Sequence, residues 1–190
     1  RTIIVFSKVN IKKNAVTNFR KLTTNHYPNI FRPSSKPLLS GDTIRKESQH
    51  VFDETQTLNT ANVKTNDLVF VKTDLLGQFF NHYHKKISAE YILISHNSDN
   101  SVKKEQSMLM DSKVIHWFAM NLDMEMTEKI SPIPIGFENR RYLSNGRLRN
   151  LINIKKDSFG TTKKDKIMAS FNTHTNFSIR GPLLKQLEED

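Results

Sequence analysis

The chain has 190 residues, of which 36% are hydrophobic and 25% charged, and its 29 Lys and Arg against 19 Asp and Glu give a formal net charge of +10. The low content of Gly and Pro excludes a collagen-like or linker-type sequence, and no apolar run approaches the roughly 20 residues of a membrane-spanning helix. The absence of Cys excludes a disulfide scaffold, a thiolate zinc site and a cysteine nucleophile.

A pattern of regular structure is cut off at each end of the chain. The first residue is Arg1 rather than Met, and the strand-like run Thr2–Phe6 follows at once. A helical pattern over Ser178–Glu189 stops with the chain. We therefore expect a piece of a longer protein. The localisation stays open between the cytoplasm and a Golgi-type lumen, because a missing signal peptide or anchor says little about such a piece.

Short apolar runs alternate with helical patterns along the chain. After Thr2–Phe6, residues 10–36 are polar and are predicted as loop with some helix. Ser40-Gly41-Asp42 is predicted to cap a helix that continues to about Glu54. Two further helices are predicted to begin at Thr73 and Ser178. The later runs predicted as strands are Asp67–Lys72, Glu90–Ser95, Lys113–Phe118, Lys129–Ile135 and Lys166–Phe171.

Continuous apolar runs of four to six residues, separated by helices, are typical of a parallel sheet that is covered on both faces. The sequence therefore predicts an α/β fold: a doubly wound, Rossmann-like parallel sheet with helices on both faces. Residues 140–165 differ, because they are rich in Lys, Arg, Asn and Ser and hold one weak apolar cluster at Leu151–Ile154. This segment is either a solvated surface excursion or a linker between domains, and we favour the linker.

The first candidate site follows the run Glu90–Ser95. In open parallel sheets, ligands bind beyond the carboxyl ends of the strands. Here His96, Asn97, Ser98 and Asp99 stand in a row. They could hold a polyhydroxylated ligand, and His96 or Asp99 could act as a general base. Alternatively, they form a turn that caps the next element.

The second candidate site is the loop after the last predicted strand. Asn172, Thr173 and Asn176 lead into a helix that carries Arg180 in its first turn. A helix N-terminus presents free N–H groups and a partial positive charge, so this loop could hold the diphosphate of a sugar nucleotide. Phosphate loops usually rely on Gly for close approach, whereas Gly181 comes late. A plain N-cap is the competing interpretation.

Two further strand ends carry polar residues. Pro134 and Gly136 turn the chain after one run, and Glu138 and Asn139 project beyond it. A structural turn followed by solvated charge explains this segment equally well. Asn121 ends another apolar run and could face the same cleft.

Several enzyme classes lack their motifs in this sequence. There is no G-x-G-x-x-G, no G-x-x-x-x-G-K-[ST] and no G-x-S-x-G. His82 and His84 lack the other residues of an H-E-x-x-H site. No D-x-D follows a strand, and Asp123 and Glu125 are expected on a polar surface. We therefore predict no metal site.

Five short motifs, each present once, follow one another in the region from about Ser40 to Arg180. They are S-G-D-T-I-R at 40–45, N-D-L-V-F-V-K-T at 66–73, Y-I-L-I-S-H-N-S-D at 91–99, W-F-A-M-N at 117–121 and P-I-P-I-G-F-E-N at 132–139. Together they resemble exostosin-like glycosyltransferases, including relatives encoded by bacteria and large viruses. The resemblance implies metal-independent transfer of a sugar from a nucleotide-sugar to a glycan or other hydroxyl acceptor, with no cofactor besides that co-substrate.

The resemblance also implies a two-domain, GT-B type architecture, of which this chain is mostly the N-terminal half. Residues 1–139 would form the acceptor-side domain, 140–165 a basic linker or excursion, and 166–190 the start of the donor-side domain. Most of a donor-side domain would then lie outside this chain. The implied residue roles are as follows: catalytic, Asp99 and His96; acceptor-binding, Asn97, Ser98, Asn121, Glu138 and Asn139; donor-binding, Arg180, Asn172, Thr173 and Asn176.

The positive charge suggests a competing class, a domain that binds nucleic acid or another polyanion. Basic residues cluster at Arg140, Arg141, Arg147, Arg149, Lys155, Lys156, Lys163, Lys164 and Lys166. No helix-turn-helix, zinc-finger, RRM or KH pattern accompanies them, so we favour the transferase over a nucleic-acid partner. The cluster equally suits an anionic acceptor or peripheral association with a membrane. A non-catalytic sugar-binding module is a third alternative, and the oligomeric state stays open.

Overall fold

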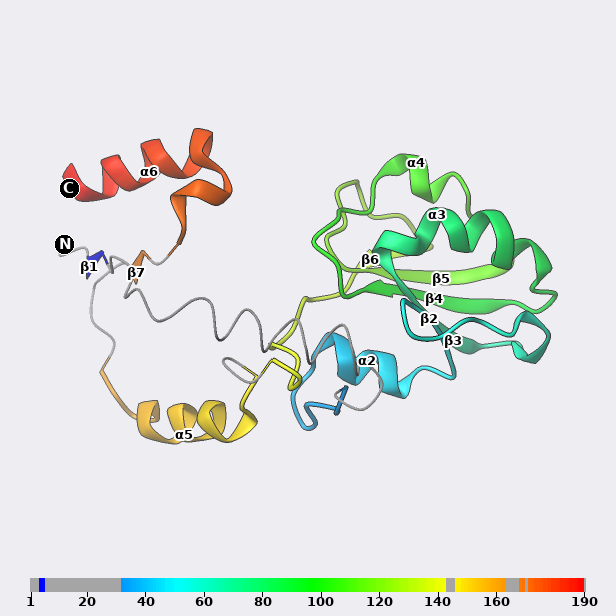
Figure 1. Cartoon of the computed structure of the whole chain (residues 1–190), viewed down its shortest axis with the longest axis horizontal. Helices are drawn as coiled ribbons and strands as arrows, with labels where there is room; N and C mark the ends of the chain where they lie inside the picture. The colour runs from blue at the N-terminus through cyan, green and yellow to red at the C-terminus, as the bar shows by residue number, and fades with distance from the viewer. Residues whose placement is uncertain (1–3, 6–31, 143–145, 163–167, 170, 190) are drawn as a thin grey trace. The chain divides into compact units, whose positions relative to one another are not determined.

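A computed structural model describes residues 4–5, 32–142, 146–162, 168–169 and 171–189 (Figure 1). The chain divides into two compact units, one formed by Phe19–Asn150 and the other by Arg1–Asn18 together with Leu151–Asp190.

The larger unit is built on a five-stranded sheet in which every pair of neighbouring strands is parallel. The strand order is the chain order, β2-β3-β4-β5-β6. This sheet confirms the predicted α/β, Rossmann-like fold. The strands are β2 (His50–Phe52), β3 (Asp67–Lys72), β4 (Tyr91–His96), β5 (Val114–Ala119) and β6 (Ile130–Pro132).

Short helices connect these strands. The stretch from Thr73 to Lys86, between β3 and β4, is helical throughout, although it changes from 3-10 to α to π geometry and back. The predicted start of a helix at Thr73 is therefore confirmed. The helices of this unit are α2 (Gly41–Glu47), η1 (Thr60–Asn62), η2 (Thr73–Leu75), α3 (Leu76–Gln78), η3 (Phe79–Tyr83), η4 (His84–Lys86) and α4 (Lys104–Ser107).

Helices cover both faces of the sheet, as predicted. Side chains alternate along a strand. On one face, Val69 and Trp117 pack with Phe79 and Phe80 of the helical stretch in the main core. On the opposite face, Phe70 and Ile94 pack against Ile44 of α2 in a smaller cluster, at the place where Figure 1 shows α2 across the sheet from α3 and α4.

The helix predicted from Ser40 to about Glu54 is shorter than expected, so this prediction was wrong. The backbone N–H and the hydroxyl of Ser48 both donate to the carbonyl of Ile44 and end α2 after Glu47. Val51 and Phe52 then pair with β3 in strand β2. Their β-branched and aromatic side chains favour a strand, and their helical spacing after Ile44 is a coincidence.

The smaller unit contains the two short strands β1 (Ile4–Val5) and β7 (Met168–Ala169), which pair in parallel. The described part of the first predicted strand thus pairs with β7 and does not join the five-stranded sheet. Helix η5 (Thr173–Thr175) and helix α6 (Phe177–Glu189) follow, and α6 confirms the helix predicted at the end of the chain.

The basic segment 140–165 holds a regular element that the sequence analysis did not predict, helix α5 (Leu148–Ser158). Its first residues fall in the larger unit and its remainder in the smaller one. The predicted domain boundaries at residues 139 and 165 stay predictions. The loop predicted over residues 10–36 lies outside the described residues as far as position 31.

Candidate functional site

A cavity of about 750 Å³ opens at the carboxyl-terminal edge of the sheet. The residues around it follow β3, β4, β5 and β6 in the chain, and the first residue of α2 closes one side. Six residues predicted for the catalytic or acceptor role from their position after a strand line it together: His96, Asn97, Ser98, Asp99, Glu138 and Asn139. The structure thus brings together residues that the sequence suggested one strand at a time.

Helix α2 meets the end of β4 at very short range. The Ser40 hydroxyl accepts from the backbone N–H of Thr43 and caps the helix. Gly41, the next residue, packs directly on Asn97 and His96. A Cβ built on Gly41 would lie 2.6 Å from Nδ1 of His96 and closer still to the side-chain oxygen of Asn97. Only glycine fits here, because any side chain would push α2 away from the cavity.

Three side chains from distant parts of the chain form a closed set of hydrogen bonds beside this contact. The Nδ2 of Asn97 donates to the Asp42 carboxylate at 3.2 Å, and Nδ2 of Asn139 donates to Oδ1 of Asn97 at 3.3 Å. Asn139 in turn accepts from the backbone N–H of Asp42 at 2.7 Å. Asn97 and Asn139 were predicted to bind the acceptor, but these bonds give both side chains a structural task at the back of the cavity.

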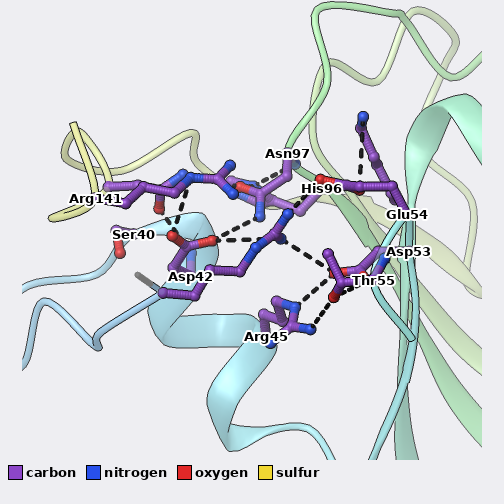
Figure 2. A network of polar contacts seen from close by, with 12 residues as sticks. Ser40, Asp42, Arg45, Asp53, Glu54, Thr55, His96, Asn97 and Arg141 are labelled. Atoms are coloured by element: carbon purple, nitrogen blue, oxygen red, sulfur yellow. Dashed lines mark hydrogen bonds and ion pairs between the residues drawn. The ribbon is translucent and has the colours of Figure 1, made fainter. Parts of the chain in front are cut away.

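The Asp42 carboxylate is the charged centre of this arrangement (Figure 2). Its side chain is fully buried, and Nε of Arg141 and Nη1 of Arg32 lie 3.3 Å and 3.9 Å from its oxygens. Burial raises the pKa of Asp42, and the nearby guanidinium groups of Arg141, Arg32 and Arg45 offset part of that effect. Arg141 itself lines the cavity.

A second buried carboxylate, Asp53, continues the network away from the cavity (Figure 2). It accepts from Nε of Arg45 at 2.6 Å, from Nη1 of Arg32 at 3.1 Å and from the hydroxyl of Thr55 at 2.7 Å. Burial alone would raise the pKa of Asp53, but the hydrogen bonds from Arg45 and Thr55 outweigh it and hold the pKa below its usual value. Arg32 therefore ties the two carboxylates together, and it also pairs with Glu54.

His96 is buried, with both ring nitrogens engaged. Its Nδ1 accepts from the backbone N–H of Asn97 at 2.8 Å, and its Nε2 lies 3.2 Å from the carbonyl of Pro134, which can only accept. This pattern fixes the neutral tautomer with the proton on Nε2. Burial lowers the pKa of His96, which also favours the neutral ring. The prediction that His96 could act as the base finds no support in this geometry, because its basic nitrogen is already occupied.

Asp99 contrasts with its neighbours, because its carboxylate is exposed and forms no recorded hydrogen bond or ion pair with the described residues. The adjacent loop is held in place. Ser98 and Asn100 donate to Oδ1 of Asp74 at 2.6 Å and 2.7 Å, and Lys72 pairs with the same carboxylate at 3.0 Å. Asp99 also lines a second, smaller cavity.

Burial alone would raise the pKa of Asp74, but the hydrogen bonds from Ser98, Lys72 and Asn100 outweigh burial and hold the pKa below its usual value. The anchoring carboxylate is therefore ionised under ordinary conditions. Asn121 adds a further support, since its Nδ2 donates to the carbonyl of Ser98 at 3.2 Å. Asn121 was predicted to face the cleft and bind the acceptor, but it supports the loop from outside the set of residues that line the cavity. Glu138 is exposed on the wall of the cavity.

The residues predicted to bind the donor lie in the smaller unit, close to one another. Oδ1 of Asn172 accepts from the backbone N–H of His174, and the carbonyl of Asn176 accepts from the backbone N–H of Arg180. Nη1 of Arg180 donates to the Asn172 carbonyl at 3.2 Å and so closes the loop, in which Thr173 begins η5.

Three residues of the network, Arg32, Asp53 and Arg141, were missed by the sequence analysis. Asp53 directly follows β2 and begins a polar run, but the helix predicted to about Glu54 hid this strand end. Arg32 and Arg141 carry no comparable signal, and their partners are far away in the chain. A second signal was Asp42, which belongs to the S-G-D-T-I-R motif but was considered only as a helix cap.

Among the described residues, no three His, Asp or Glu side chains converge as a metal site would require. None of the helices in this part of the chain combines the length and the hydrophobicity needed to cross a bilayer. The chain matches no protein-family model, and no curated protein or solved structure is significantly similar to it.

Proposed function

We propose that the cavity binds a carbohydrate hydroxyl acceptor, and that the chain forms the acceptor side of a metal-independent, exostosin-like glycosyltransferase of the GT-B type. One observation carries the proposal: Asp99 presents a free carboxylate at the rim of a polar cavity in which the neighbouring side chains of Ser98 and Asn100 are held by hydrogen bonds to Asp74. The order of motifs along the chain agrees with it.

The walls of the cavity suit a sugar. Ligand sites of this kind combine apolar surface with a few placed polar groups, and volumes of roughly 300 to 1,000 Å³ are usual. Phe137 and Tyr142 supply aromatic surface, and Glu138 and Lys72 supply polar groups at the rim. A cavity of about 750 Å³ is large enough for one or two sugar rings.

In the proposed reaction, Asp99 accepts the proton of the acceptor hydroxyl as that oxygen attacks the anomeric carbon of the donor. The bond from the anomeric carbon to the leaving nucleotide breaks in the same step. Within the smaller unit, Arg180 and the N–H groups at the start of α6 are proposed to bind the phosphate of a donor. Asn97 and Asn139 act as positioning residues for the Asp99 loop.

The test combines binding with turnover on the whole chain. Thermal shift against UDP-, GDP- and CMP-sugars identifies a donor, because a ligand that binds the native state raises the melting temperature. Saturation-transfer NMR with a panel of oligosaccharides identifies an acceptor, and release of free nucleotide measures transfer. Asp99→Asn is expected to keep acceptor binding and lose at least about a hundredfold in rate, since general bases contribute 10²–10⁴-fold.

The matched control is Asp123→Asn, which removes an exposed carboxylate that does not line the cavity. An Asp99→Asn protein with full transfer activity would remove Asp99 from its role. Sugar binding without turnover of any donor would support the acceptor side alone or a non-catalytic sugar-binding module, since most of a donor-side domain would lie outside this chain. A flat response to every sugar would overturn the proposal.

A further inference from the structure

Helix α5 exposes an apolar face. Leu148, Leu151 and Ile152 recur at intervals of three and four residues, and Phe159 follows Ile152 by seven, so all four side chains fall on one side of the helix. Ile152 is 40% exposed and Phe159, just beyond the helix end, is 89% exposed. No residue of this helix is buried. A side of this composition is normally covered in a stable protein.

Basic side chains border that apolar face. Arg149 and its helical neighbour Lys156, seven residues on, lie along one flank. Lys155 falls within the apolar side itself, where its long alkyl stem can lie along the face while the ammonium reaches outward. The opposite side of the helix carries Asn150, Asn153 and the acidic Asp157 and is free of basic residues.

We propose that α5, with Phe159, binds the surface of an anionic membrane. An apolar face bordered by basic residues, with polar side chains on the back, is the pattern of a helix that lies in the plane of a lipid interface. The apolar side chains would enter the boundary between headgroups and acyl chains. The flanking cations would meet the negative surface potential of anionic lipids. This inference stands independently of the proposed transferase activity.

A membrane explains this helix better than a nucleic acid does. Phosphodiester backbones are bound by cations and polar groups, and single strands add stacking on aromatic rings. Neither mode uses exposed aliphatic side chains such as Ile152 and Ile154, which are 40% and 62% exposed. A lipid interface accommodates both the basic and the aliphatic side chains, because its headgroups are anionic and its acyl chains are apolar.

The experiment is co-sedimentation of the full 190-residue chain with vesicles, one set of neutral phosphatidylcholine and one containing about a third phosphatidylserine. Binding is expected to the anionic set and to weaken as salt is raised from 0.05 to about 0.5 M, because screening reduces attraction to the surface. Ile152→Ser with Phe159→Ser is expected to lower the partition coefficient by about tenfold or more. Lys155→Gln with Lys156→Gln is expected to lower it severalfold.

Two control variants repeat the same changes elsewhere. Met108→Ser removes an apolar side chain that is 76% exposed, and Lys103→Gln with Lys104→Gln removes two exposed lysines beside and within α4. Both controls are expected to bind vesicles like the wild type. A thermal melt of each variant separates loss of binding from loss of folding.

Three results would overturn the proposal. One is an absence of binding to anionic vesicles at low salt. Another is binding that the α5 variants and the controls weaken equally, which would reflect net charge alone. The third is tight RNA or DNA binding that Lys155→Gln with Lys156→Gln abolishes while vesicles stay unbound, which would assign the helix to a nucleic acid.

Discussion

The backbone N–H of Asp42 donates a 2.7 Å hydrogen bond to Oδ1 of Asn139, although 97 residues separate the two in the chain. Asp42 lies in the first turn of α2, and Asn139 lies in the segment that follows β6. The bond joins the segment before β2 to the segment after β6, and these segments also meet where the backbone N–H of Phe137 donates to the carbonyl of Leu39 at 2.8 Å. The shape of the cavity therefore depends on the global fold and cannot be built by any local segment.

Asn139→Ala is expected to destabilise the larger unit. The substitution leaves the backbone N–H of Asp42 without its acceptor and Oδ1 of Asn97 without its donor. Leaving a buried or half-buried polar group unpaired costs about 1–3 kcal/mol. Urea unfolding should report this loss. Asn62→Ala, at an exposed asparagine in η1, is the control and should change stability by less than about 0.5 kcal/mol. Equal stabilities of the two variants would contradict the role given to Asn139.

Gly41→Ala is expected to cost about 1–3 kcal/mol or more, because overpacking forces neighbours to move. The new Cβ would meet the side chains of Asn97 and His96, neither of which can retreat without breaking other hydrogen bonds. Binding of any ligand in the cavity should weaken in parallel.

The matched control is Gly77→Ala in α3, where a new Cβ would meet nothing within 4 Å. Alanine is the better helix former, so this variant should equal or exceed the wild type in stability. Chemical denaturation of both proteins gives the comparison. If Gly41→Ala were as benign as Gly77→Ala, the close approach of α2 to β4 would be wrong.

The strands β3 to β6 and the position of the cavity could be predicted from the sequence because they depend on local patterns. The runs at Asp67–Lys72 and Tyr91–His96 are almost uninterrupted in β-branched and aliphatic residues, which is the signature of buried parallel strands. Polar residues directly after such strands must meet at one edge of the sheet. The location of His96 and Asp99 followed from that rule alone.

The chemical state of those residues could not be predicted in this way. Which ring nitrogen of His96 carries the proton depends on the carbonyl of Pro134, which is 38 residues away in the chain. The pairing of Arg32 with Asp53 has the same origin, since the two come from different segments and no periodicity links them. The predicted end of α2 was wrong for a local reason, because the Ser48 hydroxyl binds the carbonyl of Ile44.

Asp53→Asn tests the ionic part of the network. The amide nitrogen would replace Oδ2, the oxygen that accepts from Arg45 and Arg32, and would set an N–H against their N–H groups. It would also leave the Arg32 guanidinium, which is 3% exposed, without its closest buried counter-charge. Removing one partner of a buried ion pair costs about 3–5 kcal/mol.

Differential scanning calorimetry of Asp53→Asn and of the exposed control Asp123→Asn should separate the two effects. The control is expected to melt within a degree or two of the wild type, since surface substitutions are nearly neutral. A small shift for Asp53→Asn would mean that water screens the network more than its burial indicates.

His96 predicts a pH dependence of stability in the neutral range. Burial lowers the pKa of the folded state below the usual value of 6.5, so the unfolded chain takes up the proton at a higher pH than the folded chain. Its contribution is therefore complete above about pH 6.5 and is lost as the pH falls below that value, with a slope of up to about 1.4 kcal/mol per pH unit. Protonation would also place a hydrogen on Nδ1, facing the backbone N–H of Asn97.

The measurement is urea unfolding between pH 5.5 and 7.5 for the wild type, His96→Gln and the exposed-histidine control His82→Gln. His84 is also buried and contributes a slope of the same sign, because burial lowers its pKa. The raised pKa of Asp42 acts in the opposite sense at more acidic pH. The share of His96 is therefore the difference between the slopes of the wild type and His96→Gln. Identical slopes would show that His96 takes up its proton in the folded protein as readily as in the unfolded chain, which the bond from Asn97 should prevent.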